Sequence, residues 1–258
     1  MRRDANYLDY AIMRLAIISD IHGNLLALET VLADLRTHGA DATINLGDCV
    51  TSPLWPRETL DLLDTLDLPT VRGNHDRWVA ERARNEMSPS ITFTHDALSA
   101  EQRRRLGALP ATLQLDSGVL AVHGTPDSDV DYLLEEAVDG RLALATAATL
   151  DRRLGAHSNT LILCGHSHHQ HVAHAPGNRL VVNPGSVGCP RYADNENPFR
   201  GEASTPHARY AIATLRAGGW SVELFVLGYD WSMVAEQARR NDRADWADAF
   251  LGDQATHR

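Results

Sequence analysis

The sequence predicts an α/β fold, and two patterns along the chain support this. In the first part of the chain, short apolar runs alternate with segments of helical spacing, which is typical of parallel strands connected by helices. In the second part, pairs of strands separated by short turns predominate, which adds antiparallel strands. Each early strand is followed by a polar loop, and ligands of parallel sheets bind at such strand ends.

The elements of the first part can be assigned in order. Residues 14–19 are a short, Ile-rich apolar run that predicts a buried strand. Apolar side chains then recur at helical spacing from Leu25 to Leu35, and Gly39 is expected to end this helix as a C-terminal cap. The other elements expected here are strands at 42–46 and 69–72, a helix at 58–66 and a charged helix that ends near residue 86.

The second part is expected to contain more strands than helices. A helix is predicted at 97–106 with Asp96 as its N-cap, and a polar loop at 195–206. The remaining predicted elements are an antiparallel pair at 112–115 and 118–123, strands at 161–164 and 179–182, a hairpin at 208–215 and 220–227, and two helices within 231–250. Because no linker or repeat divides the chain, we expect one domain at 13–258, preceded by an extension at 1–12.

Composition limits the classes of partner. The formal net charge is -10 and the aromatic fraction is 6%, so neither the overall field nor an aromatic platform favours stable nucleic-acid binding. No stretch is apolar enough to span a membrane, and the first residues lack the apolar segment of a signal peptide. The three cysteines form no C-x-x-C pair, which favours reduced thiols and a cytoplasmic protein. The oligomeric state is left open.

Five polar loops share a feature that indicates a metal site. Each follows an apolar strand and contains Asp, Asn or His. The loops are Asp20-x-His22, Gly47-Asp48, Gly73-Asn74-His75-Asp76, His123-Gly124 and Gly165-His166-x-His168. A single Asp in such a loop is more often a helix cap, and a single His is more often an ordinary surface residue. Five such loops in one chain are difficult to explain as caps.

The side chains of these loops are chemically consistent as metal ligands. Carboxylate, imidazole and amide oxygen atoms suit Mn, Fe, Zn, Ni or Mg ions. No thiolate is placed to join them, which disfavours a structural zinc site. In an Asp-x-His or His-x-His pair, alternate residues of an extended backbone can direct both side chains to one point.

The set DxH, GD, GNHD, H and GHSH, in this order, resembles the calcineurin-like metallophosphoesterase superfamily. The finer motifs DIHGN, RGNHD, VHGTP, CGHSH and NPGSVG are similar to those of its small bacterial and archaeal branch, the YfcE-like phosphodiesterases. The resemblance covers about residues 15–227. It implies a four-layer α/β/β/α sandwich, in which two mixed sheets are flanked by helices and the active site lies at one end.

The resemblance also implies a role for the loop residues. Two divalent cations would be bound, the first by Asp20, His22 and His168, the second by Asn74, His123 and His166, and both by Asp48. A water molecule shared by the two cations would be the nucleophile. Manganese is the expected metal, with iron, nickel, zinc or magnesium as alternatives.

Other residues of the motifs are expected to contact the substrate or to support those that do. His75 would stabilise charge on the phosphoryl oxygens or protonate the leaving group, and Asp76 would accept the other ring proton of His75 or cap the following helix. Asn24 and Asn74 are candidates for substrate contact, and Arg191 could bind a phosphate or form a surface salt bridge. The histidines expected to face solvent along the next strand are His169, His171 and His174.

These features predict a metal-dependent phosphodiesterase or phosphomonoesterase that acts on a small-molecule phosphoester such as a nucleotide. A dinucleoside polyphosphate hydrolase and a protein phosphatase would use the same metal site, because specificity depends on the surrounding loops. A non-catalytic interaction module, like the retromer subunit of this fold, is a further alternative. It predicts damaged loops, whereas His75 and seven apparent ligands are present.

Overall fold

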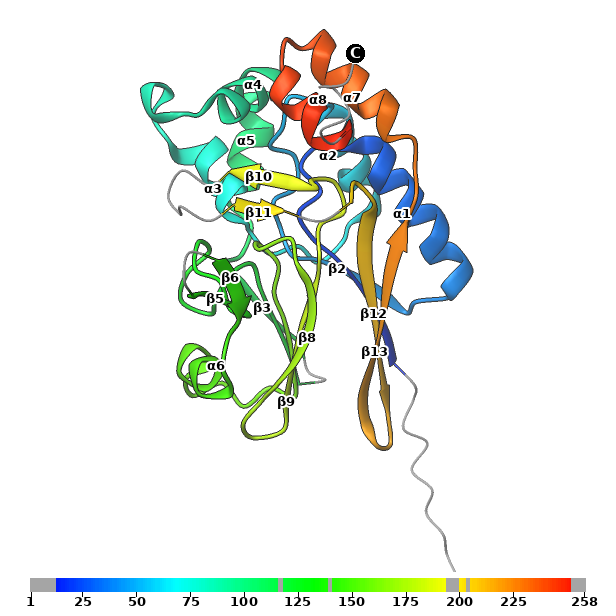
Figure 1. Ribbon diagram of the computed structural model, residues 1–258, viewed down its shortest axis with the longest axis vertical. Helices are drawn as coiled ribbons and strands as arrows, with labels where there is room; N and C mark the ends of the chain where they lie inside the picture. Colours follow the sequence, from blue (N-terminus) through cyan, green and yellow to red (C-terminus); the bar gives the residue numbers. More distant parts are fainter. Residues whose placement is uncertain (1–12, 116–117, 139–140, 194–199, 203–204, 252–258) are drawn as a thin grey trace, which may run out of the picture.

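The computed structural model describes residues 13–115, 118–138, 141–193, 200–202 and 205–251, so the expected extension at 1–12 lies outside the described residues. Two larger sheets pack face to face in these described residues (Figure 1). The first has the strand order β13-β12-β1-β2, with the bounds Gly219–Leu227, Ala208–Arg216, Met13–Ile18 and Ala42–Asn45. The second has the order β3-β4-β7-β9-β8, with the bounds Thr112–Leu115, Val119–Val122, Leu161–Leu163, Arg179–Pro184 and Gln170–Ala175.

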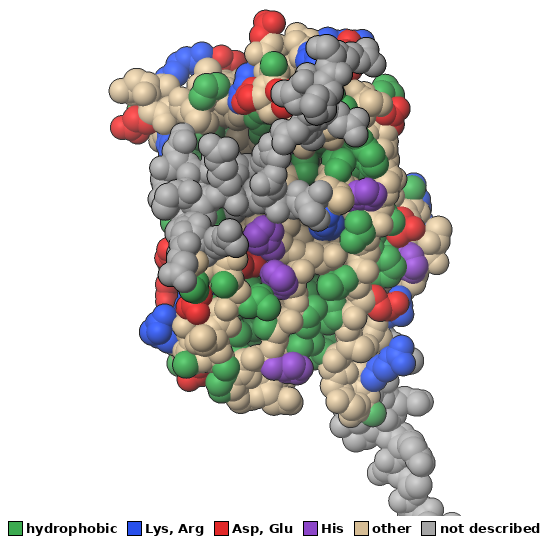
Figure 2. Space-filling view, viewed as in Figure 1, with side chains coloured by type: hydrophobic (Ala, Val, Ile, Leu, Met, Phe, Trp, Pro, Cys, Tyr) green, Lys and Arg blue, Asp and Glu red, His purple; other side chains and the backbone are tan. Residues whose placement is uncertain are grey.

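Both sheets contain parallel and antiparallel pairs. β1 pairs in parallel with β2, and β7 pairs in parallel with β4 and β9. The strands β12, β13, β3 and β8 join by antiparallel pairing, which confirms the predicted β3–β4 pair and β12–β13 hairpin. Figure 2 shows histidine side chains on the face over β8, the strand that contains His171 and His174.

Helices cover the outer faces of both sheets, which confirms the four-layer sandwich. Helix α1 (Leu25–His38) packs its buried Leu28, Val31 and Leu35 against the first sheet. As predicted, Gly39 ends this helix with a left-handed backbone at φ 66°. Helix α6 (Ala147–Leu154) covers the second sheet with Leu150 and Leu154.

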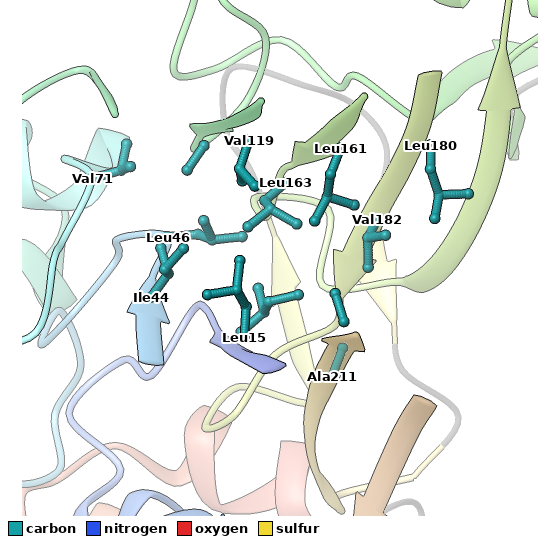
Figure 3. Close-up of a cluster of buried hydrophobic side chains, with 13 residues drawn as sticks. Leu15, Ile44, Leu46, Val71, Val119, Leu161, Leu163, Leu180, Val182 and Ala211 are labelled. Atoms are coloured by element: carbon teal, nitrogen blue, oxygen red, sulfur yellow. The ribbon is translucent and has the colours of Figure 1, made fainter. Parts of the chain in front are cut away.

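The main core lies between the sheets, where both inner faces contribute branched apolar side chains (Figure 3). Leu15 and Ile17 of β1 share this cluster with Leu161 and Leu163 of β7, and each is at most 2% exposed. Side chains on alternate residues of a strand point to one face. The almost wholly apolar strands therefore fill the central core with one set of residues and contact the outer helices with the other.

The other helices gather at the upper end of the sandwich in Figure 1. They are α2 (Pro56–Leu66), α3 (Asn74–Glu81), α4 (Pro89–Ala97), α5 (Ala100–Gly107), α7 (Trp231–Arg240) and α8 (Ala244–Leu251). The prediction of two C-terminal helices is confirmed. Within the described residues, no helix combines the length and the apolar character that a membrane crossing requires.

Several predicted boundaries are wrong. Residues 69–72 form a single bridge, from Thr70 to Asn45, rather than a strand. The charged helix ends at residue 81 and is followed by a 3₁₀ turn at Arg84–Glu86. The predicted helix at 97–106 begins at Ala100, because Ser99 and Gln102 form a capping box, and Asp96 lies inside α4.

Two small hairpins were not predicted. They are β5 (Glu135–Val138) with β6 (Arg141–Leu144), and β10 (Arg191–Ala193) with β11 (Arg200–Glu202). The second hairpin takes part of the segment that was expected to be a polar loop. Residues 195–199 and 203–204 of that segment lie outside the described residues.

The position of the core can be tested with a pair of leucines. Replacing the fully buried Leu163 by alanine is expected to lower the free energy of unfolding by about 2–5 kcal/mol, because it leaves a cavity between the sheets. Leu224 on β13 is 42% exposed, so Leu224→Ala should change it by less than about 0.5 kcal/mol. Urea unfolding of the metal-free protein measures both values, and equal losses would contradict this placement of the core.

Candidate metal centre

The predicted polar loops meet at one end of the sandwich, beyond the carboxyl ends of the parallel strands. Asp20 N donates a hydrogen bond to Gly47 O at 3.0 Å, which joins the loops after β1 and β2. His166 N donates to the Asp20 carboxylate at 3.2 Å, which joins the two sheets. His75 N donates to Asp48 Oδ1 at 2.9 Å and ties in the GNHD loop. Loops that are far apart in the sequence therefore form one site.

A first group of candidate ligand atoms comes from Asp20, His22, Asp48 and His168. The Nε2 atoms of His22 and His168 are 3.2 Å apart. Asp20 Oδ1 lies 3.3 Å from His168 Nε2, and Asp48 Oδ2 lies 3.6 Å from His22 Nε2. None of the four residues is more than 3% exposed.

A second group comes from Asp48, Asn74, His123 and His166. His123 Nε2 lies 2.9 Å from Asn74 Oδ1 and 3.4 Å from Asp48 Oδ2. One ligand atom each from Asp48, His123 and His166 lie within 4.8 Å of one another. Asp48 belongs to both groups, which is the position expected of a carboxylate that bridges two cations.

Hydrogen bonds on the outer sides of three imidazole rings determine what the rings present to the site. The Nδ1 atoms of His22, His123 and His168 lie 3.0, 2.7 and 2.9 Å from main-chain carbonyl oxygens. Because a carbonyl oxygen only accepts, each Nδ1 carries a proton, and each ring, when it is neutral, directs the lone pair of Nε2 inward. His166 has the opposite tautomer, since its Nε2 lies 2.9 Å from Val130 O.

The inner atoms of both groups are therefore acceptors that face one another. Asp20 Oδ1 is buried and has no hydrogen-bond donor, and lone pairs at these distances repel unless positive charge lies between them. That charge can come from extra protons on the rings or from metal ions. The mixture of imidazole nitrogen and carboxylate or amide oxygen suits first-row divalent cations, so these residues fit a metal centre.

The charges of the cluster shift the pKa values of its members. Burial acts to raise the pKa of Asp20, but His168 lowers it to about 2. Burial acts in the same way on Asp48, yet His123 and His75 hold its pKa well below the usual value. Burial acts to lower the pKa of His123, but Asp48 raises it to about 10. Without a cation, protons on the rings thus balance the carboxylates.

The backbone at the site is held in an unusual conformation. Five of the seven predicted ligands have positive φ angles, which are 55° at Asp20, 46° at His22, 54° at Asp48, 67° at His166 and 60° at His168. Residues other than glycine rarely adopt positive φ angles, and such backbone strain concentrates at functional sites. The strain turns side chains from consecutive loops inward to a common point.

Gly73 shows how tightly these loops are packed. A Cβ atom at this position would overlap the Asp48 carboxylate and its main-chain nitrogen. A glycine here lets the GNHD loop approach closely enough for His75 N to reach Asp48. The glycine of the motif therefore positions the shared carboxylate.

Asp76 does not have the predicted contact with His75. Its two oxygen atoms accept hydrogen bonds from the main-chain nitrogens of Asp48, Cys49 and Gly73, at 2.9, 3.0 and 2.9 Å. It is the third residue of α3, and Gly73 is the N-cap. Burial, with Asp48 adding to it, raises the pKa of Asp76 to about 7. Asp76 thus holds the loop that carries Asp48.

The His75 ring is packed beside the first group of ligands. Its centroid lies 5.1 Å from that of His22 and 4.7 Å from that of Trp78. Its Nδ1 is buried and has no hydrogen-bond partner. Burial lowers the pKa of His75 to about 3, although Asp48 opposes this shift. The Asp76 carboxylate gives this ring no support, because its oxygens bind main-chain nitrogens instead.

Asn24 was expected to contact substrate, but its side chain has a different role. It is the N-cap of α1, where Oδ1 accepts from Ala27 N at 3.2 Å. Its Nδ2 donates to Gly188 O at 2.9 Å and to Tyr229 Oη at 3.0 Å, and the residue is fully buried. All of its polar atoms are thus used inside the fold. Arg191 begins β10, and its side chain lies outside the described part of the chain.

Three further residues support the site and were not predicted to do so. Asn183 Nδ2 donates to Gly165 O at 2.8 Å and Ser186 Oγ donates to Asp20 O at 2.8 Å, so the NPGS segment holds two ligand loops. Cys189 corrects the prediction that no thiol joins the site. Its thiol and the rings of His22 and His168 offer ligand atoms within 4.8 Å of one another. The sequence had suggested that no thiol is near.

The fold and the site together define a class of metal-binding phosphoesterases, and a comparison with known families agrees. The family model for the calcineurin-like phosphoesterase superfamily domain matches residues 13–203. The chain therefore belongs to the calcineurin-like phosphoesterase superfamily.

Individual relatives are similar over most of their length. A metallophosphoesterase from Sphaerobacter thermophilus is 27% identical, covers 91% of this chain and 100% of its own, and has a TM-score of 0.66. The uncharacterized protein MJ0912 of Methanocaldococcus jannaschii is 27% identical over 92% of this chain and 98% of its own. The hypothetical protein PH1004 of Pyrococcus horikoshii is 19% identical, covers 91% of this chain and 96% of its own, and shares the fold with a TM-score of 0.72.

The structural role of Asn24 can be separated from a role in substrate binding. Asn24→Ala removes the cap and leaves Gly188 O and Tyr229 Oη without a donor or partner, so the free energy of unfolding should fall by about 1–3 kcal/mol. Asn24→Ser, which keeps a capping oxygen, should lose less. Urea unfolding measures the loss. A raised KM with unchanged stability would instead show that Asn24 contacts substrate.

Cation binding should release protons from the rings. Because Asp48 raises the pKa of His123 to about 10 against the effect of burial, this ring is protonated at neutral pH in the metal-free protein. A cation must displace that proton, so the apparent metal affinity should increase as pH rises from 6 to about 8. Titration calorimetry with Mn²⁺ in buffers of different ionisation enthalpy counts the protons. Binding without proton release would contradict this charge balance.

Proposed function

We propose that this protein is a dinuclear-metal-dependent phosphoesterase, and specifically a phosphodiesterase that hydrolyses a small-molecule or nucleotide phosphoester. The observation that carries this proposal is the convergence of acceptor atoms from five loops into two groups that share Asp48. Membership of the phosphoesterase superfamily supports the reaction class.

The proposed ligands divide between the two groups. The first cation is assigned to Asp20, His22 and His168, the second to Asn74, His123 and His166, and both to Asp48. When bound, two divalent cations, with manganese preferred, supply Lewis acidity for an in-line displacement at phosphorus. The chain itself fixes the geometry, because main-chain carbonyls hold three of the rings and Asp76 holds the loop of Asp48.

His75 is proposed to donate a hydrogen bond to a phosphoryl oxygen. Its ring lies beside His22, and its main-chain nitrogen contacts Asp48, so the ring is at the edge of the cluster without being needed as a ligand. A pKa of about 3, set mainly by burial, leaves the ring neutral. A neutral imidazole still donates from one nitrogen, which suits stabilisation of developing charge on the phosphoryl group.

A nearby cavity supports a small substrate. It has a volume of about 440 Å³ and is lined by residues of the 125–136 segment together with Arg152 and Arg153. It adjoins the second group, because the Tyr132 ring stacks on His166 with centroids 4.9 Å apart. Cavities of this size accommodate small molecules, which favours a nucleotide-sized substrate over a phosphoprotein.

The three free, buried cysteines fit a cytoplasmic setting.

The proposed function is tested by phosphoester hydrolysis with defined metals. Metal-free protein is reloaded with Mn²⁺, Ni²⁺, Zn²⁺ or Mg²⁺ and assayed on aryl phosphodiesters and monoesters, cyclic nucleotides, dinucleoside polyphosphates and a phosphopeptide. We expect the highest kcat/KM on a diester with Mn²⁺ and no activity after chelation. Metal-loaded protein that hydrolyses none of these substrates would support the non-catalytic module instead.

His75 offers a sharper test of the mechanism. His75→Ala should lower kcat by about 10²–10³-fold, because it removes one donor to the transition state, while the metal content stays unchanged because His75 is not a proposed ligand. His174→Ala on β8 is the matched control, since that histidine is exposed. Metal analysis and steady-state kinetics distinguish the outcomes. A variant that loses metal would place His75 among the ligands, and an unaffected kcat would remove it from the mechanism.

A further inference from the structure

A third group of metal-ligand side chains lies outside the two groups described above. Glu135, His169 and His171 each offer one ligand atom, and these atoms lie within 4.8 Å of one another. The two rings have centroids 6.1 Å apart. The sequence predicted that both histidines face solvent, but both are part-buried, whereas His174 is exposed as expected. The histidine-rich face over β8 in Figure 2 is the surface of this region.

The strand geometry explains why the two histidines face Glu135 together. Gln170 lies between them in the sequence. Its side-chain amide nitrogen, Nε2, donates to Pro184 O, Tyr210 O and Phe225 O, each at 3.1 Å. Its side chain therefore points toward β9 and the first sheet. Residues on either side of it in an extended chain point the opposite way. The rings of His169 and His171 are thus turned toward the first residue of β5.

Glu135 is the member that requires an explanation. It is 2% exposed, and its Oε1 is buried with no hydrogen-bond partner. The Ser167 side chain forms a hydrogen bond with this carboxyl group and Arg153 lies near it, but Oε1 has no partner. The Arg153 Nη1 donates at 2.8 Å to two main-chain carbonyls, those of Leu133 and Glu135. A carboxyl oxygen such as Oε1 is rarely buried without a donor, because it loses its hydration.

We propose that Glu135, His169 and His171 bind one divalent transition-metal ion, with Zn²⁺ as the best match, at a site separate from the dinuclear centre. Two imidazoles and one carboxylate form a ligand set that proteins use for zinc, with a fourth position open to water. Magnesium and calcium prefer oxygen ligands alone, so the two histidines select against them. The ion would compensate the buried carboxylate and fasten the β5–β6 hairpin to the start of β8.

The proposal is tested by counting zinc ions in the full chain. Equilibrium dialysis at a fixed free Zn²⁺ concentration, followed by metal analysis, should give three ions in the wild type and two in Glu135→Gln or His171→Asn. Asp48→Asn, which disrupts the dinuclear centre, should retain the third ion. When Glu135→Gln is added to Asp48→Asn, the affinity for Zn²⁺ should fall by more than roughly 10–100-fold. That range is the loss expected if Glu135 only formed a hydrogen bond to a ligand.

Controls separate this site from general binding by surface histidines. His174→Asn should keep three ions. When Co²⁺ replaces Zn²⁺, one absorption component should be lost in Glu135→Gln and in His171→Asn but not in His174→Asn. Circular dichroism verifies that each variant is folded, and His171→Asn replaces Glu135→Gln if the latter is not. The proposal is overturned if the wild type binds no third ion, or if it keeps that ion in both ligand variants. The dinuclear centre would stand in either case.

Discussion

The structure depends on one constraint, which is that many electron-pair acceptors converge in a buried space with too few donors. His22, His123 and His168 cannot rotate away from this space, because main-chain carbonyls hold their outer nitrogens. Asp48 cannot withdraw either, because the Asp76 carboxylate accepts hydrogen bonds from the main-chain nitrogens of Asp48 and Cys49. Positive charge must therefore enter the site, either as protons on the rings or as cations.

The rest of the fold supports that arrangement. The five proposed ligand residues with positive φ angles cost of order 1–3 kcal/mol each. The cost is offset elsewhere, in particular by the core between the two sheets, where Leu15, Ile17 and Leu163 are almost fully buried. Because the ligand loops leave the ends of rigid parallel strands, the strained loops are held from both sheets at once. The hydrogen bond from His166 N to the Asp20 carboxylate is one of the links between the two sheets.

The sequence was sufficient for the features that depend on local patterns. Apolar runs followed by Asp, Asn or His located the strands and the loops that meet, and the Gly39 cap and β12–β13 hairpin followed from short-range signals. Features that depend on tertiary contacts were missed. No pattern near Asp76 shows that its carboxylate accepts from Asp48 N rather than from the His75 ring. Asn24 resembles a site residue in the sequence, but its amide donates to the hydroxyl of Tyr229, 205 positions away. The burial of Glu135 was equally invisible, because β5 is a short strand of a small hairpin.

The central claim is that two cations share Asp48 at the end of the sandwich, and anomalous diffraction from crystals of the manganese-loaded protein tests it most directly. The account predicts two strong peaks about 3.5–4 Å apart, one beside Asp20, His22 and His168 and the other beside Asn74, His123 and His166, with the carboxylate of Asp48 between them. A single peak, or manganese bound away from Asp48, would contradict it.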